Sequence, residues 1–575
     1  MTAHRRYLRL LFLLTLVLAP TAYSVGPQTV MVEMTDGTKL ATDYYVPEEG
    51  GPAFPVILAR STYGRALGMK DGERFNGGGY AFVIQDVRGM GASEGEKNVF
   101  YAEGWRESQH DGADTVAWIK AQEWCNGKIG TYGGSALGMT QVLLAPATRD
   151  VVFQFIEVAP SSWYGQVAYQ GGVFRKSPME GWLTLIGQPH VIDLYKSHPT
   201  CDAFWTYYNA ESKAPDITAA ALHVGGWYDI FQQGTINNFV SRQNNGGPGA
   251  KGNQKLIMKW SPHGPDVTPD YTHNENRFDL RVSHQRDALL DAWLKGNTAA
   301  IADMPTVWYY TLGDDAPGAP GMEWRTADGW PPFPTVDTPY FLGSDGRLTP
   351  DLTQAAAGSR SFTYDPANPF PTHGGANLLP TLPSGPFDQR KGNEGRNDVL
   401  KFATEPLVQP VEATGRVRAR LYVSSDAPDT DFTAKLIDVF PQGDEREILV
   451  LDNIQRVKYR NGFEEPAPLL TSADEVVEVE IDLWSISWVF NTGHQIGLQI
   501  SSSNYPRFDK NPNTGDDFPS EDNLRVANNT VHSGKTHPSA LLLPLRDLSA
   551  DDDGNGLTVL EEWAAAGKAE QADAE

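Results

Sequence analysis

One serine of this chain stands on a turn that suits nucleophilic chemistry. A strand-like run at 128–132 leads into Gly133-Gly134-Ser135-Ala136-Leu137-Gly138, and an apolar, helix-forming run at 139–145 follows. Glycine lets the backbone bend sharply between strand and helix, so the Ser135 hydroxyl would project from the turn and the next backbone N–H could bind an oxyanion. The pattern departs from strict G-x-S-x-G because leucine stands at 137. The alternative is an ordinary strand–helix connection with a passive serine.

A candidate acid and a candidate base follow Ser135 along the chain. Residues 219–224 are predicted to form a buried strand that leads into a turn ending at Asp229, and 255–260 a second strand that leads into His263. Each side chain therefore stands just after a strand, in the order Ser, Asp, His that an α/β-hydrolase uses for its catalytic triad. A helix cap is the alternative role for Asp229.

The other histidines fit the role of base less well. The chain has 12 histidines, and only His263 combines a preceding apolar strand, a tight turn and a position beyond the candidate acid. His223 lies inside a strand pattern and is predicted to be a hydrogen-bonded core residue. His284 falls in a polar helical stretch and is predicted to face solvent. His263 is therefore the predicted general base.

A tyrosine is the fourth candidate. Residues 55–59 are predicted to form a short apolar strand, and Tyr63 lies in the loop that follows it. In an α/β-hydrolase the loop after the third strand supplies the second oxyanion donor, and a tyrosine hydroxyl could serve as well as a backbone N–H. The alternative is a loop aromatic that covers the core.

These residues belong to a series of segments that continues into the C-terminal half. The series consists of Tyr63 in its loop, 85–95, Gly134-Ser135, 226–229, His263, 385–389, 396–400, 423–432 and 501–508. From about residue 29 to 545 the chain resembles the cocaine-esterase (CocE/NonD) group, which belongs to the X-prolyl dipeptidyl-peptidase class of serine hydrolases. The resemblance implies Ser135 as nucleophile, His263 as general base and Asp229 as its orienting acid.

The resemblance also implies an oxyanion hole and a substrate pocket. The Tyr63 hydroxyl and the Ala136 N–H would form the oxyanion hole. The family usually carries tyrosine at 136, so alanine keeps the backbone donor but changes the pocket wall. The implied pocket aromatics are Trp163, Trp182 and Phe231, whose rings would bind an apolar part of the substrate. The alternative is that these rings fill the core between cap and sheet.

Carboxylates in the cap bear on the choice of substrate. An aminopeptidase would need acidic groups aimed at the substrate ammonium, and the candidates are Glu180 and Asp202, but nothing in the sequence places them near the nucleophile. We therefore expect an esterase or acylase that forms an acyl-enzyme with a small-molecule ester or amide or a short peptide, without a catalytic cofactor. The alternatives are an X-prolyl dipeptidyl peptidase and, in another class, an inert secreted protein that binds a glycan or a surface.

The pattern of elements predicts an α/β-hydrolase domain with an inserted helical cap, followed by an all-β jelly roll. Strands alternate with helices at 27–145 and 216–335, as in a parallel sheet, and the aromatic-rich segment 146–215 is assigned to the cap. Residues 336–547 contain regularly spaced strands separated by Pro, Gly and Asp turns, which is typical of a β-sandwich.

The N-terminus predicts export. Residues 1–24 combine early arginines, an apolar run at 10–19 and small residues at the end, as in a cleavable signal peptide, so we expect a secreted or periplasmic protein. The apolar run is too short to span a bilayer comfortably, and no membrane span is expected after its removal. Export permits a disulfide between Cys125 and Cys201, but we expect Cys125 to be a buried free thiol.

Charge narrows the choice of partners. The 575 residues carry a net charge of −25, from 47 basic and 72 acidic side chains. Nucleic acids and anionic membrane surfaces require basic patches, so neither is an expected partner. The simplest role of the negative charge is solubility.

The C-terminal tail, 548–575, contains a candidate calcium loop. A twelve-residue pattern supplies oxygen donors at positions 1, 3, 5, 7 and 12, with glycine at position 6. The donors are Asp551, Asp553, Asn555, the Leu557 carbonyl and Glu562. A helix at 558–566 would follow this loop. The alternative is an acidic, disordered tail.

Overall fold

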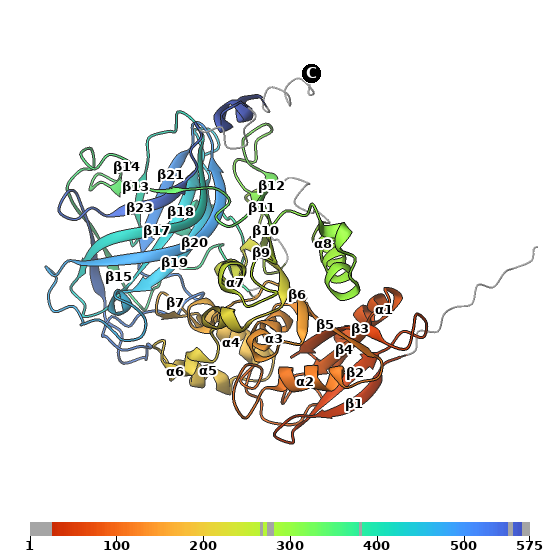
Figure 1. Ribbon diagram of the computed structural model, residues 1–575. Helices are drawn as coiled ribbons and strands as arrows, with labels where there is room; N and C mark the ends of the chain where they lie inside the picture. The colour runs from red at the N-terminus through yellow and green to blue at the C-terminus, as the bar shows by residue number, and fades with distance from the viewer. Residues whose placement is uncertain (1–25, 265–267, 273–280, 379–381, 550–555, 566–575) are drawn as a thin grey trace, which may run out of the picture.

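The computed structural model describes residues 26–264, 268–272, 281–378, 382–549 and 556–565 (Figure 1). The signal peptide predicted at 1–24 lies outside these residues. Within the described ranges, no helix has both the length and the apolar character needed to cross a membrane.

A ten-stranded sheet organises the N-terminal half of the chain, with the order β1-β2-β4-β3-β5-β6-β9-β10-β11-β12. From β4 to β11 in this order the strands run parallel, and antiparallel strands close both edges. The strands are β1 (Gln28–Glu33), β2 (Lys39–Tyr45), β3 (Phe54–Ser61), β4 (Ala81–Asp86), β5 (Cys125–Gly134), β6 (Val151–Glu157), β9 (Ala220–Tyr228), β10 (Gln254–Pro262), β11 (Val307–Thr311) and β12 (Glu323–Ala327). Central strands such as β3 and β9 are buried along their whole length, as a parallel sheet with two covered faces requires.

Helices cover both faces of this sheet, because parallel strands need crossover connections. Alternate residues of β3 enter two different apolar clusters: Ile57 packs with side chains of α1 and α8, and Val56 with side chains of α2 and α3. The helices are α1 (Met69–Gly77), α2 (Asp111–Lys120), α3 (Ala136–Leu144), α7 (Gln232–Asn245) and α8 (Arg281–Leu290). Short turns lie at Arg65–Gly68, Ala145–Ala147, Asp291–Lys295 and Thr298–Ile301.

The segment between β6 and β9 forms the cap. It therefore begins later than the predicted residue 146, because Val151–Glu157 is a strand of the sheet. It is mostly helical, and it also contains a short hairpin that was not predicted (Figure 1). Its elements are a π-helical turn (Tyr164–Ala168), β7 (Tyr169–Gln170), β8 (Val173–Phe174), α4 (Lys176–Leu185), α5 (His190–Lys196), α6 (Ala203–Thr206) and a 3₁₀ turn (Glu211–Asp216). The hairpin strands are two residues each, too short for a periodic pattern to reveal.

Two antiparallel sheets form the C-terminal half and pack into a sandwich, as the jelly-roll prediction requires. The larger sheet contains β14 (Leu348–Thr349), β13 (Val336–Leu342), β23 (Ala540–Leu545), β17 (Val411–Ser425), β22 (Ala527–Ser533), β15 (Gly358–Tyr364) and β20 (Val477–Phe490). The smaller contains β16 (Leu400–Ala403), β21 (Gln495–Ser501), β18 (Asp431–Val439) and β19 (Glu447–Arg456). A helix, α9 (Gln389–Asn393), and a 3₁₀ turn (Val457–Tyr459) complete this half.

The sandwich shares a core with the hydrolase sheet. Trp227 and Tyr228 of β9 lie in the same apolar cluster as Trp488 of β20, and the Tyr228 hydroxyl donates to the Leu449 carbonyl at 2.9 Å. Because β9 leads directly to Asp229, the sandwich supports the strand that carries the candidate acid.

A buried histidine stabilises the sandwich. His494 Nδ1 lies 2.7 Å from an Asp438 oxygen, and Nε2 lies 3.3 Å from an Asp314 oxygen. Although burial favours the neutral ring, the hydrogen bonds to Asp314 and Asp438 raise the pKa of His494 to about 9. The histidine is therefore a cation between two carboxylates at neutral pH.

The cysteines and the remaining predicted histidines can be placed directly. Cys125 and Cys201 are both free, and Cys125 is half-buried at the start of β5 rather than fully buried as predicted. His223 is buried in β9, where Nε2 lies 3.0 Å from Gln254 Oε1 and burial lowers its pKa to about 3. His284 is exposed on α8. The prediction for His284 is confirmed, and His223 is a core residue as predicted, although only its Nε2 has a hydrogen-bond partner among the described residues.

Candidate active site

Ser135 occupies a sharp turn between β5 and α3. Its φ is 54°, a left-handed conformation that costs a non-glycine residue of order 1–3 kcal/mol and persists only where the surroundings hold it. Its N–H donates to the Glu157 carbonyl of β6 at 2.9 Å, which provides part of that support. The turn therefore exposes the hydroxyl at the carboxyl end of β5, as the sequence predicted.

The departure from strict G-x-S-x-G has a steric reason. A Cβ on Gly138 would lie 2.8 Å from the Cβ of Ala159, so the close approach of helix and neighbouring chain occurs at 138 rather than 137. A Cβ on Gly133 would lie 2.5 Å from the Cβ of Leu137, so the glycine before the serine makes room for the leucine after it. The position that requires glycine is therefore 138 rather than 137, and the sharp turn at Ser135 is retained.

A continuous hydrogen-bond chain joins the three predicted triad residues. Ser135 Oγ lies 2.9 Å from His263 Nε2, and His263 Nδ1 lies 2.6 Å from Asp229 Oδ2. Asp229 is fully buried, and its other oxygen accepts the Phe231 N–H at 2.7 Å. With an ionised Asp229, Nδ1 carries the proton and Nε2 is free to accept the serine proton. Three segments distant in sequence meet here because β5, β9 and β10 end at the same edge of the sheet.

Tyr63 lies in the loop after β3, the strand next to β5. The residue is 42% exposed, and its hydroxyl accepts a hydrogen bond from Trp182 Nε1 at 3.0 Å. Because the indole is only a donor, the phenolic proton of Tyr63 remains available for another acceptor. The bond also ties α4 of the cap to the catalytic domain. Sequence reasoning placed Trp182 in the pocket but missed this contact, since nothing local signals the partner of an indole N–H.

Ala136 is the first residue of α3, where a backbone N–H has no partner within the helix. The positive end of the helix dipole lies at the same point and favours developing negative charge. The Ala136 side chain is buried in the aromatic cluster beneath the cap. The methyl group thus lies where the resemblance implies a larger ring in related proteins.

The three predicted pocket aromatics belong to one buried cluster, but they differ in position. Trp182 contacts Tyr63, and Phe231 meets the His263 ring edge-on, with centroids 5.5 Å apart. Trp163 is fully buried behind Phe100, which lies 6.0 Å from both tryptophan rings. Trp182 and Phe231 therefore adjoin the site, whereas Trp163 is part of the core in this structure.

The two cap carboxylates are engaged elsewhere. Glu180 Oε1 accepts from Lys176 at 2.8 Å and from Lys196 at 3.1 Å. Asp202 caps α6 by accepting the Phe204 N–H at 2.9 Å, and it lies 2.7 Å from His198 Nδ1. A substrate ammonium would have to compete with these partners for either carboxylate.

A buried arginine supports the loop that carries the acid, and no local sequence pattern predicted it. Arg175, in the cap, donates to the Ile230 carbonyl at 3.0 Å and also bonds the Gln166 carbonyl. Complete burial lowers the pKa of its guanidinium to about 9. Because Ile230 follows Asp229 directly, the contact fixes the backbone beside the acid.

Most of the candidate calcium loop lies outside the described residues, including Asp551, Asp553 and Asn555. Leu557 and Glu562 are described, and residues 559–565 are helical, close to the predicted 558–566. Thr558 and Glu561 form a reciprocal cap, with the Thr558 N–H donating to Glu561 at 2.8 Å and the Glu561 N–H to Thr558 at 3.2 Å. Among the described residues, no group of three His, Cys, Asp or Glu side chains is arranged to hold a metal ion.

Two family models match the chain. The X-Pro dipeptidyl-peptidase (S15 family) model matches residues 36–190 and 184–265, and the X-Pro dipeptidyl-peptidase C-terminal non-catalytic domain matches 298–542. Cocaine esterase of Rhodococcus sp. (strain MB1 Bresler) is 34% identical, over 91% of this chain and 99% of the relative. The chain belongs to the cocaine-esterase family. Members of this family are serine hydrolases, so the protein is a serine hydrolase that acts on ester or amide bonds.

Solved structures share the whole architecture. An aminopeptidase from a marine sediment archaeon (Thaumarchaeota archaeon) has a TM-score of 0.76 at 23% identity and covers 91% of this chain and 96% of its own. An α-amino acid ester hydrolase has a TM-score of 0.72 at 23% identity, covering 90% and 96%. These similarities confirm the predicted fold, an α/β-hydrolase domain followed by a β-sandwich.

Proposed function

We propose that this serine hydrolase works by acyl transfer to Ser135, with His263 as general base and Asp229 as its orienting acid. The observation that carries the proposal is the hydrogen-bond chain of 2.9 and 2.6 Å that links the three side chains. His263 Nε2 takes the hydroxyl proton as Ser135 Oγ attacks the carbonyl carbon. The imidazolium, stabilised by Asp229, gives that proton to the leaving group, and water then releases the acid by the same route.

We propose that the Tyr63 hydroxyl and the Ala136 N–H stabilise the oxyanion. The Trp182 bond to the Tyr63 oxygen supports this role, because it leaves the phenolic proton to point elsewhere. The start of α3 supports the second donor. One such donor is typically worth ~100- to 1000-fold in turnover.

A fluorophosphonate probe tests the nucleophile, because only an activated serine is labelled. We expect the purified protein to be labelled, Ser135→Ala to lose the label, and Ser212→Ala, at an exposed serine of the cap, to keep it. Absence of labelling in the unaltered protein would favour an inert binding protein and contradict the proposal.

We infer that the substrate is an ester or acyl amide rather than a peptide with a free amino terminus. The inference is supported by Glu180 and Asp202, which are held by lysines and by His198 respectively. Turnover of short-chain p-nitrophenyl esters should exceed release of p-nitroaniline from dipeptides ending in proline. Faster release from the dipeptide anilides would instead identify an X-prolyl dipeptidyl peptidase, the activity named in the matching family models.

We propose that residues 1–24 direct export, so that the mature enzyme is secreted or periplasmic. Intact-mass measurement of the protein from the native host should show a chain that begins at Val25. Recovery of the chain with residues 1–24 intact from the cytoplasm would contradict this. We also propose that Asp551, Asp553, Asn555, Leu557 and Glu562 bind a structural Ca²⁺, which the cap that begins the following helix supports.

A further inference from the structure

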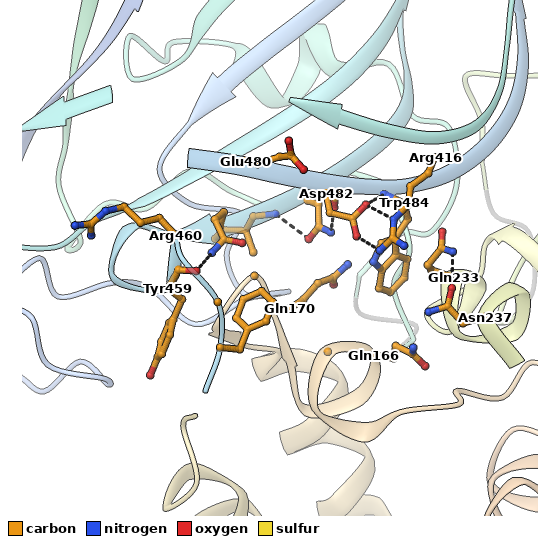
Figure 2. A pocket seen from close by; sticks show the side chains of 17 residues that line it. Gln166, Gln170, Gln233, Asn237, Arg416, Tyr459, Arg460, Glu480, Asp482 and Trp484 are labelled. Atoms are coloured by element: carbon orange, nitrogen blue, oxygen red, sulfur yellow. Dashed lines mark hydrogen bonds and ion pairs between the residues drawn. The ribbon is translucent and has the colours of Figure 1, made fainter. Parts of the chain in front are cut away.

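A cavity lies where the cap, α7 and the sandwich meet, and none of the three triad residues lines it. Its volume is about 340 Å³, within the range of small-molecule sites. The π-helical turn and β7 form one wall, α7 a second, and β17, β19 and β20 the third (Figure 2).

Most of the side chains that line the cavity are polar, and together they carry no net charge. Six amide side chains contribute both donors and acceptors: Gln166, Gln170, Gln233, Asn237, Asn453 and Gln455. Two arginines, Arg416 and Arg460, are balanced by Glu480 and Asp482, and Arg416 Nε donates to Asp482 at 2.9 Å. This balance disfavours an anion or a cation and suits a neutral ligand that is rich in hydrogen-bonding groups.

One amide is buried without a partner. Gln170 is 2% exposed, it lines the cavity, and within the described part of the chain its Oε1 accepts no hydrogen bond. Figure 2 shows this side chain near the middle of the cavity wall. A buried polar oxygen without a donor is costly, so a ligand hydroxyl that met this oxygen after the amide turned into the cavity would be bound favourably.

One aromatic side chain is held in an unusual conformation at the same cavity. Trp484 has a φ of 73° at a register shift between β17 and β20, and its backbone N–H donates to Asp482 Oδ1 at 3.1 Å. In Figure 2 the indole extends from β20 toward the cap, between Gln170 and Gln233. Left-handed backbone is rare for a bulky residue and often marks a functional position. The conformation turns a flat apolar ring into the polar cavity.

We propose that this cavity binds a neutral oligosaccharide. A pyranose ring presents C–H groups on its face and hydroxyls, each both donor and acceptor, around its edge. The face of the sugar ring would pack against Trp484. Its hydroxyls would form hydrogen bonds with the surrounding amides, and above all with Gln170. A peptide would instead require apolar recesses or an open strand edge, whereas most of the side chains that line the cavity are amides or charged groups.

Binding can be measured without turnover in a Ser135→Ala background. Affinity electrophoresis in gels that contain glucomannan, galactomannan, arabinoxylan or mixed-linkage β-glucan should show retardation by at least one polysaccharide. Calorimetry with a hexasaccharide from that polymer then gives the affinity. Trp484→Gly removes the ring while glycine tolerates the φ of 73°, and we expect at least tenfold weaker binding. Gln170→Leu should weaken binding several-fold without lowering Tm, because the oxygen it removes has no partner.

The matched control is Gln354→Leu, at an exposed glutamine of the sandwich, which should bind like the parent. If Trp484→Gly fails to fold, judged by circular dichroism, Gln170→Leu decides the question. No retardation in any polysaccharide would overturn the proposal, as would unchanged affinity in both cavity variants. Since the assay reads no catalysis, either result leaves the proposed hydrolase mechanism untouched.

Discussion

The bond from Trp182 to Tyr63 leads to a quantitative prediction. Trp182→Phe keeps an aromatic ring at a position that is 7% exposed but removes the only polar atom of the side chain. The Tyr63 hydroxyl, on a residue that is 42% exposed, then loses the donor 3.0 Å away that holds it in place. If Tyr63 is an oxyanion donor, catalysis should fall because its hydroxyl samples more orientations.

The size of the effect follows from the kind of bond. A neutral hydrogen bond contributes a net ~0.5–1.5 kcal/mol, which corresponds to about a two- to tenfold loss in kcat. Tyr63→Phe removes the donor itself and should cost ~100- to 1000-fold. In the Tyr63→Phe background, Trp182→Phe should cost no more than about twofold further, since coupled residues are not additive. Hydrolysis of a p-nitrophenyl ester, with kcat and KM measured for all four proteins, tests this cycle.

Trp205→Phe provides the control. Trp205 lies in the same buried cluster and its Nε1 donates to the His198 carbonyl at 3.1 Å, so the change removes a similar bond and a similar volume. We expect kcat to stay within about twofold of the parent. Equal losses in Trp205→Phe and Trp182→Phe would show a general effect on the cap. If Trp182→Phe still lowered kcat two- to tenfold in the Tyr63→Phe background, Trp182 would act independently of Tyr63. That result would refute the reasoning.

Three further outcomes are expected. Gly138→Val should lower Tm by several degrees, since its Cβ would lie 2.8 Å from another side chain. Gly77→Ala should not lower Tm, because no atom lies within 4 Å of the Cβ that it adds. Equal Tm values for the two variants would contradict the packing argument. Because the pKa of His494 is about 9, against 6.5 for an ordinary histidine, its stabilising contribution is full below pH 6.5 and is lost as pH rises to 9. Thermal melts across this pH range should show that Tm falls as pH rises, and that the fall is smaller in His494→Gln. Identical slopes of Tm against pH in the two proteins would contradict this prediction. Calorimetric titration with CaCl₂ should show one site per chain that Asp551→Asn weakens at least tenfold, and no heat with the parent protein would exclude the calcium loop.

The sequence alone determined the fold class and the three triad candidates. Apolar runs such as 219–224 and 255–260 could be recognised as buried strands, and in a parallel sheet every strand delivers its next residues to the same edge. This rule predicts from local patterns alone that Asp229 and His263 lie close together, without knowledge of any particular side-chain contact. Because Asp229 and His263 follow Ser135 in the order that an α/β-hydrolase uses, the three residues could be assigned as acid, base and nucleophile.

Only the tertiary structure decided which side chains contact the site. The Trp182–Tyr63 bond and the Arg175 contact with the acid loop each join segments whose packing is set by the whole fold. The lack of a partner for the Gln170 oxygen also depends on how the whole fold packs around it. The same is true of the shift of a glycine requirement from 137 to 138, which depends on how closely α3 approaches Ala159. Local periodicity reports which face of an element is buried, but a hydrogen-bond partner is set by where distant elements come to rest, and a single sequence does not encode that position in any local pattern.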